Sequence, residues 1–225
     1  MNKKNGFVAI MLSVLVFTSM FFLVQGENQP VNSRDDIIPE VISLSDDQKV
    51  AAIVNGVEIP QKEYERLLAN AGILYRAQLS KLLEQRNTGK IGTEEYEVRI
   101  ATLDQYHNDP LRNQKLLDTL IQDELLYQEA RAKGYQVTIE EARAYEARAF
   151  DILAPEQLQL LTQYAESLSM TYAEYSEDYL VPIRQKKMTS ALLLAEYKDA
   201  SLEEYQQMIN SLLEKAEIQI LIKTN

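Results

Sequence analysis

Two short β-prone segments bracket a long stretch of helical periodicity, and this arrangement constrains the fold more than any other feature of the chain. The first segment, Val50–Ile59, has the sequence VAAIVNGVEI, in which the Asn-Gly pair is typical of a two-residue hairpin turn. The second segment, Ile218–Ile222, alternates and is β-branched. Because an isolated hairpin is marginally stable in water, we expect both segments to share one small sheet.

Helices are predicted between these two segments. Apolar side chains recur from Gln61 to Arg86 at the three- and four-residue spacing of one helix face. Pro182 lies inside another helical stretch and is expected to kink or split it. The predicted fold is therefore mainly α, a multi-helix domain (residues 50–225) closed by a small β-sheet formed from its N- and C-terminal segments. Three later helix starts have the capping-box pattern: Thr138 with Glu141, Thr171 with Glu174, and Ser201 with Glu204.

Residues 1–26 are predicted to be a membrane anchor or a signal peptide. Two lysines precede Gly6–Val24, a run of 19 uncharged residues. This apolar length favours a transmembrane anchor, and cleavage after Gly26 is the alternative. Either interpretation places the rest of the chain outside the cytoplasm, as a single-pass protein of the cell membrane or as a secreted protein. Residues 27–49 are acidic and lack periodicity, so they are expected to form a flexible linker.

The composition excludes many kinds of catalytic and binding site. The chain has no cysteine and one histidine, so zinc ribbons, iron–sulfur clusters, thiol nucleophiles and paired-histidine sites are excluded. A net charge of -11 argues against a nucleic-acid partner. Adjacent glutamates lie in the first turns of predicted helices, where the helix dipole stabilises negative charge. We therefore expect no catalytic residue, no metal and no cofactor.

Two sequence stretches and their order carry a family resemblance. Val50–Leu68 (VAAIVNGVEIPQKEYERLL) combines a strand, Asn-Gly, a second strand and a helix entry. Leu117–Arg143 (LDTLIQDELLYQEARAKGYQVTIEEAR) combines a helix that ends at a glycine with the entry to another helix. With a weaker match at Met170–Tyr175 and the closing helix, they span most of residues 50–222. This order resembles the non-catalytic chaperone domain of the SurA/PrsA-type extracytoplasmic foldases, which hold unfolded chains.

The chain also departs from that family. Residues 139–200 occupy the interval in which many members carry a parvulin prolyl-isomerase domain, and they are predicted to be helical. A parvulin site is built around paired histidines, whereas this chain has only His107, which is expected to be a surface or capping residue. The resemblance therefore implies binding of unfolded polypeptides without isomerase activity.

An aromatic and apolar stripe supplies the candidate peptide-binding residues. Such a stripe forms either a seam between packed helices or a groove in which unfolded segments dock through apolar contacts. The basic run at residues 184–187 is expected to be a solvated helix face, with a membrane-surface role as the secondary alternative. The candidate residues are Leu161, Tyr164, Leu168, Tyr172, Tyr175 and Tyr179.

The favoured function is an extracytoplasmic chaperone-like protein that binds unfolded or partly folded exported polypeptides. Its expected partners are these clients and, through residues 6–24, the membrane. The alternatives are a structural or signalling subunit of an envelope complex and a degenerate peptidyl-prolyl cis-trans isomerase. A chaperone suppresses aggregation of unrelated clients, whereas a subunit binds one partner at fixed stoichiometry. The sequence specifies neither the client nor the oligomeric state.

Overall fold

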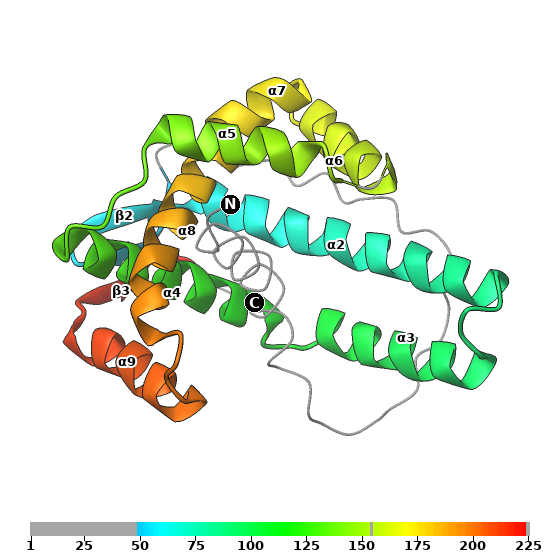
Figure 1. Cartoon of the computed structure of the whole chain (residues 1–225), viewed down its shortest axis with the longest axis horizontal. Helices are drawn as coiled ribbons and strands as arrows, with labels where there is room; N and C mark the ends of the chain where they lie inside the picture. The colour runs from blue at the N-terminus through cyan, green and yellow to red at the C-terminus, as the bar shows by residue number, and fades with distance from the viewer. Residues whose placement is uncertain (1–48, 154, 224–225) are drawn as a thin grey trace, which may run out of the picture.

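The computed structural model describes residues 49–153 and 155–223, which form a mainly helical structure with one small sheet, as predicted (Figure 1). The predicted anchor, the cleavage position at Gly26 and the linker up to residue 48 lie outside the described residues. Within the described part, no helix combines the length and the apolar character needed to cross a membrane. The elements are β1 (Val50–Val54), β2 (Val57–Pro60), α2 (Gln61–Asn87), α3 (Thr93–His107), α4 (Arg112–Ala132), α5 (Ile139–Phe150), α6 (Pro155–Ser167), α7 (Tyr172–Tyr175), the π-helical η1 (Ser176–Leu180), α8 (Val181–Leu194), the 3-10 helix η2 (Ala195–Tyr197), α9 (Leu202–Lys215) and β3 (Ile218–Ile220).

The sheet joins the two ends of the described chain. Its three strands are antiparallel in the order β2-β1-β3, and the register places Val54 of β1 opposite Ile218 of β3. The hairpin turns at Asn55 and Gly56, whose φ values of 51° and 78° are those that a two-residue turn of this kind requires. The predicted closure of the domain by its terminal segments is confirmed.

The main core lies where the sheet packs on α4 and on the first turns of α2. Ala51, Ala52 and Val54 of the central strand are fully buried, and Leu117 and Ile121 of α4 belong to the same cluster. Because β1 has a strand on each side and a helix layer against it, it is the most enclosed strand of the sheet. The positions of α2 and α4 are fixed through this core.

The second half of α2 leaves the core and runs beside α3 (Figure 1). The ring of Tyr75 stacks on His107 with a centroid separation of 3.9 Å, and the Tyr75 hydroxyl donates to Asp104 at 2.6 Å. Farther along, the Arg86 guanidinium lies 4.8 Å from the centre of the Tyr96 ring. His107 is the last residue of α3, and burial is the main reason that its pKa lies below the ordinary value.

All three predicted capping boxes are present, at the starts of α5, α7 and α9. Of the two expected effects of Pro182, a kink or a split, the split does not occur, because η1 leads directly into α8. Proline has no N–H, and its ring clashes with the carbonyl four residues earlier, here that of Asp178. The wider π-helical turn of η1 accommodates this defect while the chain continues as a helix. Beyond it, α8 packs across α4 and α5.

Candidate functional site

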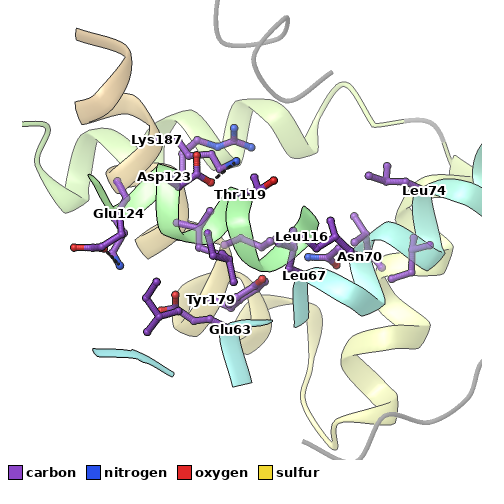
Figure 2. Close-up of a pocket in the computed structure, with 18 of the residues that line it drawn as sticks. Glu63, Leu67, Asn70, Leu74, Leu116, Thr119, Asp123, Glu124, Tyr179 and Lys187 are labelled. Carbon is purple, nitrogen blue, oxygen red and sulfur yellow. Dashed lines mark hydrogen bonds and ion pairs between the residues drawn. The ribbon is translucent and has the colours of Figure 1, made fainter. Parts of the chain in front are cut away.

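A pocket of about 300 Å³ lies between α2, α4 and α8 (Figure 2). Its lining residues on α2 extend from Glu63 to Ala77, so the long dimension of the pocket follows this helix. Ile59 of β2 lies at one end, and Tyr106 of α3 also contributes to the lining. The apolar lining consists of Ile59, Leu67, Ile73, Leu74, Ala77, Leu116, Leu120, Leu153, Leu161, Leu180 and Ile183.

Helical spacing explains why this lining is apolar. Leu67 and Leu74 are seven residues apart on α2, and Leu116 and Leu120 are four residues apart on α4, so each pair shares one helix face. Leu67, Leu74 and Leu120 are only partly buried. Apolar side chains that the fold leaves incompletely covered provide surface for an apolar ligand.

Charged side chains surround the apolar lining in equal numbers of each sign. This balance contrasts with the whole chain, whose net charge is -11. The pocket as a whole therefore presents little net charge to a ligand. The four carboxylates are those of Glu63, Asp123, Glu124 and Glu146, and the four cations are Lys115, Arg184, Lys186 and Lys187.

Three of these cations belong to the basic run on α8, and the prediction that this run is a solvated face was wrong for them. Each is paired with a carboxylate from a neighbouring helix, because α8 packs across α4 and α5 and brings their acidic positions within reach. The pairs are Arg184 Nε with Glu146 at 3.1 Å, Lys186 Nζ with Glu124 at 3.0 Å, and Lys187 Nζ with Asp123 at 3.3 Å.

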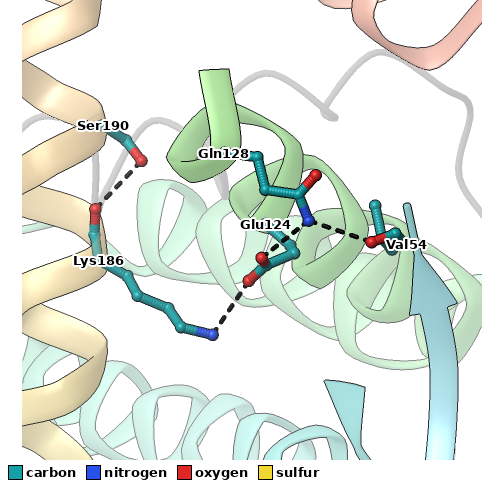
Figure 3. Close-up of polar contacts among 5 residues, drawn as sticks. All are labelled: Val54, Glu124, Gln128, Lys186 and Ser190. Carbon is teal, nitrogen blue, oxygen red and sulfur yellow. Dashed lines mark hydrogen bonds and ion pairs between the residues drawn. The ribbon is translucent and has the colours of Figure 1, made fainter. Parts of the chain in front are cut away.

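The Lys186–Glu124 pair connects the pocket to the sheet (Figure 3). Glu124 is only 4% exposed, and its carboxylate also accepts from Gln128 Nε2 at 3.0 Å. The same Gln128 nitrogen donates to the Val54 carbonyl of β1 at 3.1 Å. Burial lowers the pKa of Lys186, but the carboxylates of Glu63 and Glu124 outweigh burial and raise it above the ordinary value. The ammonium group therefore stays charged at neutral pH and links α8 through α4 to the central strand.

Three tyrosines, one each from α6, α7 and η1, form an aromatic cluster beside α2. Tyr164 meets Tyr175 edge-on at a centroid distance of 5.5 Å, and Tyr175 lies 5.4 Å from Tyr179. The exposed fractions of Tyr175 and Tyr179 are 0% and 3%, and burial raises the pKa of Tyr164 to about 12. The Arg66 guanidinium lies 4.7 Å from the centre of the Tyr179 ring. These contacts are those of a helix–helix seam.

The six predicted peptide-binding residues therefore divide into two groups. Leu161 and Tyr179 line the pocket. Tyr175 is completely buried and offers no surface to a ligand in this structure. Tyr164 belongs to the aromatic cluster, Leu168 packs against it, and the centres of the Tyr172 and Phe150 rings are 5.1 Å apart. Of the two interpretations of the stripe, the seam describes most of it, and peptide contact stays a prediction.

The half of the pocket formed by α2 and α4 was not predicted. Both apolar helix faces are visible in the sequence, but their spacing does not indicate which side chains another helix covers. The ion pairs of α8 gave no signal either, because their partners lie on other helices, 38 to 64 positions away in the printed sequence.

The pocket offers a ligand apolar contacts, and charged side chains of both signs surround them. Within residues 49–153 and 155–223, no group of three or more His, Cys, Asp or Glu side chains is placed to hold a metal ion. The pocket can therefore bury apolar side chains of a ligand while its rim contacts polar groups.

No family model, no curated protein and no solved structure matches this chain. The resemblance to the SurA/PrsA-type foldases thus rests on the sequence motifs alone, and the function has to be inferred from the geometry of the pocket.

Proposed function

We propose that this protein binds unfolded or partly folded exported polypeptides in the pocket, as an extracytoplasmic chaperone-like protein without covalent chemistry. The observation that supports this function is the incompletely covered apolar lining between α2, α4 and α8. A volume of about 300 Å³ is at the low end for pockets that enclose ligands. It suits a few side chains of an extended segment better than the surface of a folded domain.

The size of the pocket also indicates the strength of binding. Burial of a Leu-sized side chain contributes about 1.5–3 kcal/mol, and two or three such side chains therefore contribute roughly 3–9 kcal/mol before the cost of association. The cost of association, at least about 4 kcal/mol, leaves at most about 5 kcal/mol, so the net affinity lies in the high-micromolar to millimolar range, since about 4 kcal/mol corresponds to a Kd near 1 mM. Binding of this strength allows a client to be held briefly and released. A rim of balanced charge favours neither acidic nor basic clients.

The test is suppression of aggregation by the full chain, with two unrelated reduced model proteins as clients. Leu74→Asn and Leu161→Asn place a polar amide in the pocket lining, and we expect both to lose most of the suppression. Val98→Asn is the matched control, because Val98 lies on α3, is 62% exposed and does not line the pocket. Thermal melts verify that all three variants fold. Equal suppression by pocket and control variants would overturn the proposal.

The alternative of a subunit in an envelope complex is favoured by one observation. Ile220, the last residue of the edge strand β3, and the adjacent Leu221 are 47% and 55% exposed. An edge strand with exposed apolar side chains can add a strand from a partner. A single co-purifying protein at fixed stoichiometry, whose binding is lost in Ile220→Lys and kept in Leu74→Asn, would support this function instead.

A further inference from the structure

The described chain begins beside one end of the pocket. The carbonyl of Lys49 accepts a hydrogen bond from the backbone N–H of Gln61 at 2.8 Å. Gln61 lies two positions from Ile59 and two from Glu63, and both of these residues line the pocket. The residues that precede Lys49 therefore join the domain at the Glu63 end of the pocket.

The length of the pocket matches a short extended segment. From Glu63 to Ala77, α2 advances by roughly 21 Å at a rise of about 1.5 Å per residue. An extended chain advances by about 3.3 Å per residue, so roughly six or seven residues cover this distance.

A segment of suitable composition precedes Lys49. Residues Ile37–Leu44 have the sequence IIPEVISL, in which apolar residues predominate and Glu40 is the single charge. Four residues separate Leu44 from Lys49, and this connection reaches at most about 17 Å. A proline follows Ile38, and a residue before a proline favours extended backbone over helix. The segment can therefore reach the pocket and is biased towards the extended form that fits it.

The entry point of the chain gives the direction. Leu44 is the residue of the segment nearest to Lys49 in the sequence, so the Leu44 end lies at the Glu63 end of the pocket and the Ile37 end points towards Ala77. Lys115 lines the pocket, whereas its carboxylate partner Asp109 does not. The acidic pair at residues 35–36 directly precedes the segment, and its charge is complementary to that of Lys115.

We propose that residues 37–44 of this chain dock in the pocket in extended form, antiparallel to α2, and compete there with polypeptide clients. The docking rests on the pocket and the chain entry described above, and only the competition rests on the proposed function. Because the segment is covalently attached, its effective concentration at the pocket is in the millimolar range. A segment that occupies the pocket nine-tenths of the time weakens the apparent affinity for clients by about tenfold.

Docking is tested by disulfide trapping, for which the absence of cysteine from the whole chain gives a clean background. The full-length variant Val41→Cys/Leu74→Cys is oxidised at low protein concentration. The matched control is Val41→Cys/Val98→Cys, whose second cysteine lies outside the pocket. We expect the intramolecular disulfide to form at least about tenfold faster in the pocket variant, as the effective concentrations predict. A synthetic peptide of residues 35–46, added in excess, should slow this reaction. Equal rates in the two variants would overturn the docking.

Competition is measured separately, as the affinity of a fluorescent unfolded client for the full chain. Val41→Asp/Ile42→Asp disrupts the segment, and Val31→Asp, outside it, is the control. We expect the segment variant to bind the client about three- to tenfold more tightly than the control variant. Trapping without a change in client affinity would keep the docking and overturn the competition. Client binding without trapping would overturn the docking and leave the proposed function intact.

Discussion

The ion pair between Lys186 and Glu124 predicts an unequal effect of removing either partner, because the two side chains differ in burial. The side chain of Glu124 is 5% exposed, and that of Lys186 is 37% exposed. Lys186→Met leaves a buried carboxylate whose remaining donor is Gln128, and loss of one partner from a buried pair costs about 3–5 kcal/mol. Because one partner reaches water here, we expect the lower end, about 3 kcal/mol.

The opposite variant is expected to cost much less. Glu124→Gln leaves an ammonium group that can turn towards water, so the loss resembles that of a surface pair, about 1 kcal/mol. In the double variant neither charge remains, and its cost should be close to that of Glu124→Gln alone. The interaction energy of the cycle is then about 2–3 kcal/mol.

Urea denaturation of the full chain measures these free energies of unfolding, provided that the slope with urea stays constant. The pair Lys133–Glu196 is the matched control, since its N···O distance is also 3.0 Å but its side chains are 37% and 42% exposed. Its cycle should give a clearly smaller interaction energy, because both of its side chains reach water. If Lys186→Met cost no more than Lys133→Met, burial of Glu124 would not be the dominant effect, and the reasoning above would be refuted.

Three further perturbations test the sheet, the helix caps and the N-terminal segment. Deletion of residues 217–225 should lower the melting temperature of the whole domain, because β1 loses one of its two neighbouring strands. Deletion of residues 223–225 is the control. An unchanged melting temperature after the longer deletion would show that β3 is a dispensable tail. The pKa values of the capping glutamates Glu141, Glu174 and Glu204 lie below the ordinary value, chiefly because backbone N–H groups donate to their carboxylates. The stability that these carboxylates contribute is therefore fully present above about pH 5 and is lost as the pH falls through the folded-state pKa values. Replacing all three by Gln should flatten the acid side of a stability–pH curve, and an identical curve would contradict this. If residues 6–24 are an anchor, the protein should stay with membranes after a salt wash and keep its N-terminal residues, whereas mature protein that starts at Glu27 would favour a signal peptide.

Local signals in the sequence were sufficient for most of the secondary structure. Asn-Gly at positions 55 and 56 specified the hairpin because few other residues tolerate the required φ values. The capping boxes identified the starts of α5, α7 and α9, since each depends only on residues three positions apart. The pairing of the two chain ends was also predictable, because a small hairpin requires a partner.

The pocket was not predictable in the same way, because it depends on how one helix crosses others. The course of α8 determines that Arg184 and Lys186 meet acidic residues of α5 and α4, and no local pattern encodes that crossing. The tyrosine stripe illustrates the same limit. Spacing placed Tyr175 and Tyr179 on one face, but only the packing against α2 distinguishes a buried seam from an exposed groove.

The central position of β1 has a mechanical consequence. A pull on the chain at Lys49, from whatever lies before it, acts lengthwise on a strand that is hydrogen-bonded on both sides, to β2 and to β3. These bonds run across the strand, so such a load would shear both ladders at once instead of opening one bond at a time. The C-terminal end of β3 lies beside the start of β1, where the Leu221 N–H donates to the Ala51 carbonyl at 2.9 Å. A pull at Lys49 is therefore passed to the last strand through the β1–β3 hydrogen bonds, and both ladders share the load at the end where the N-terminal segment is attached.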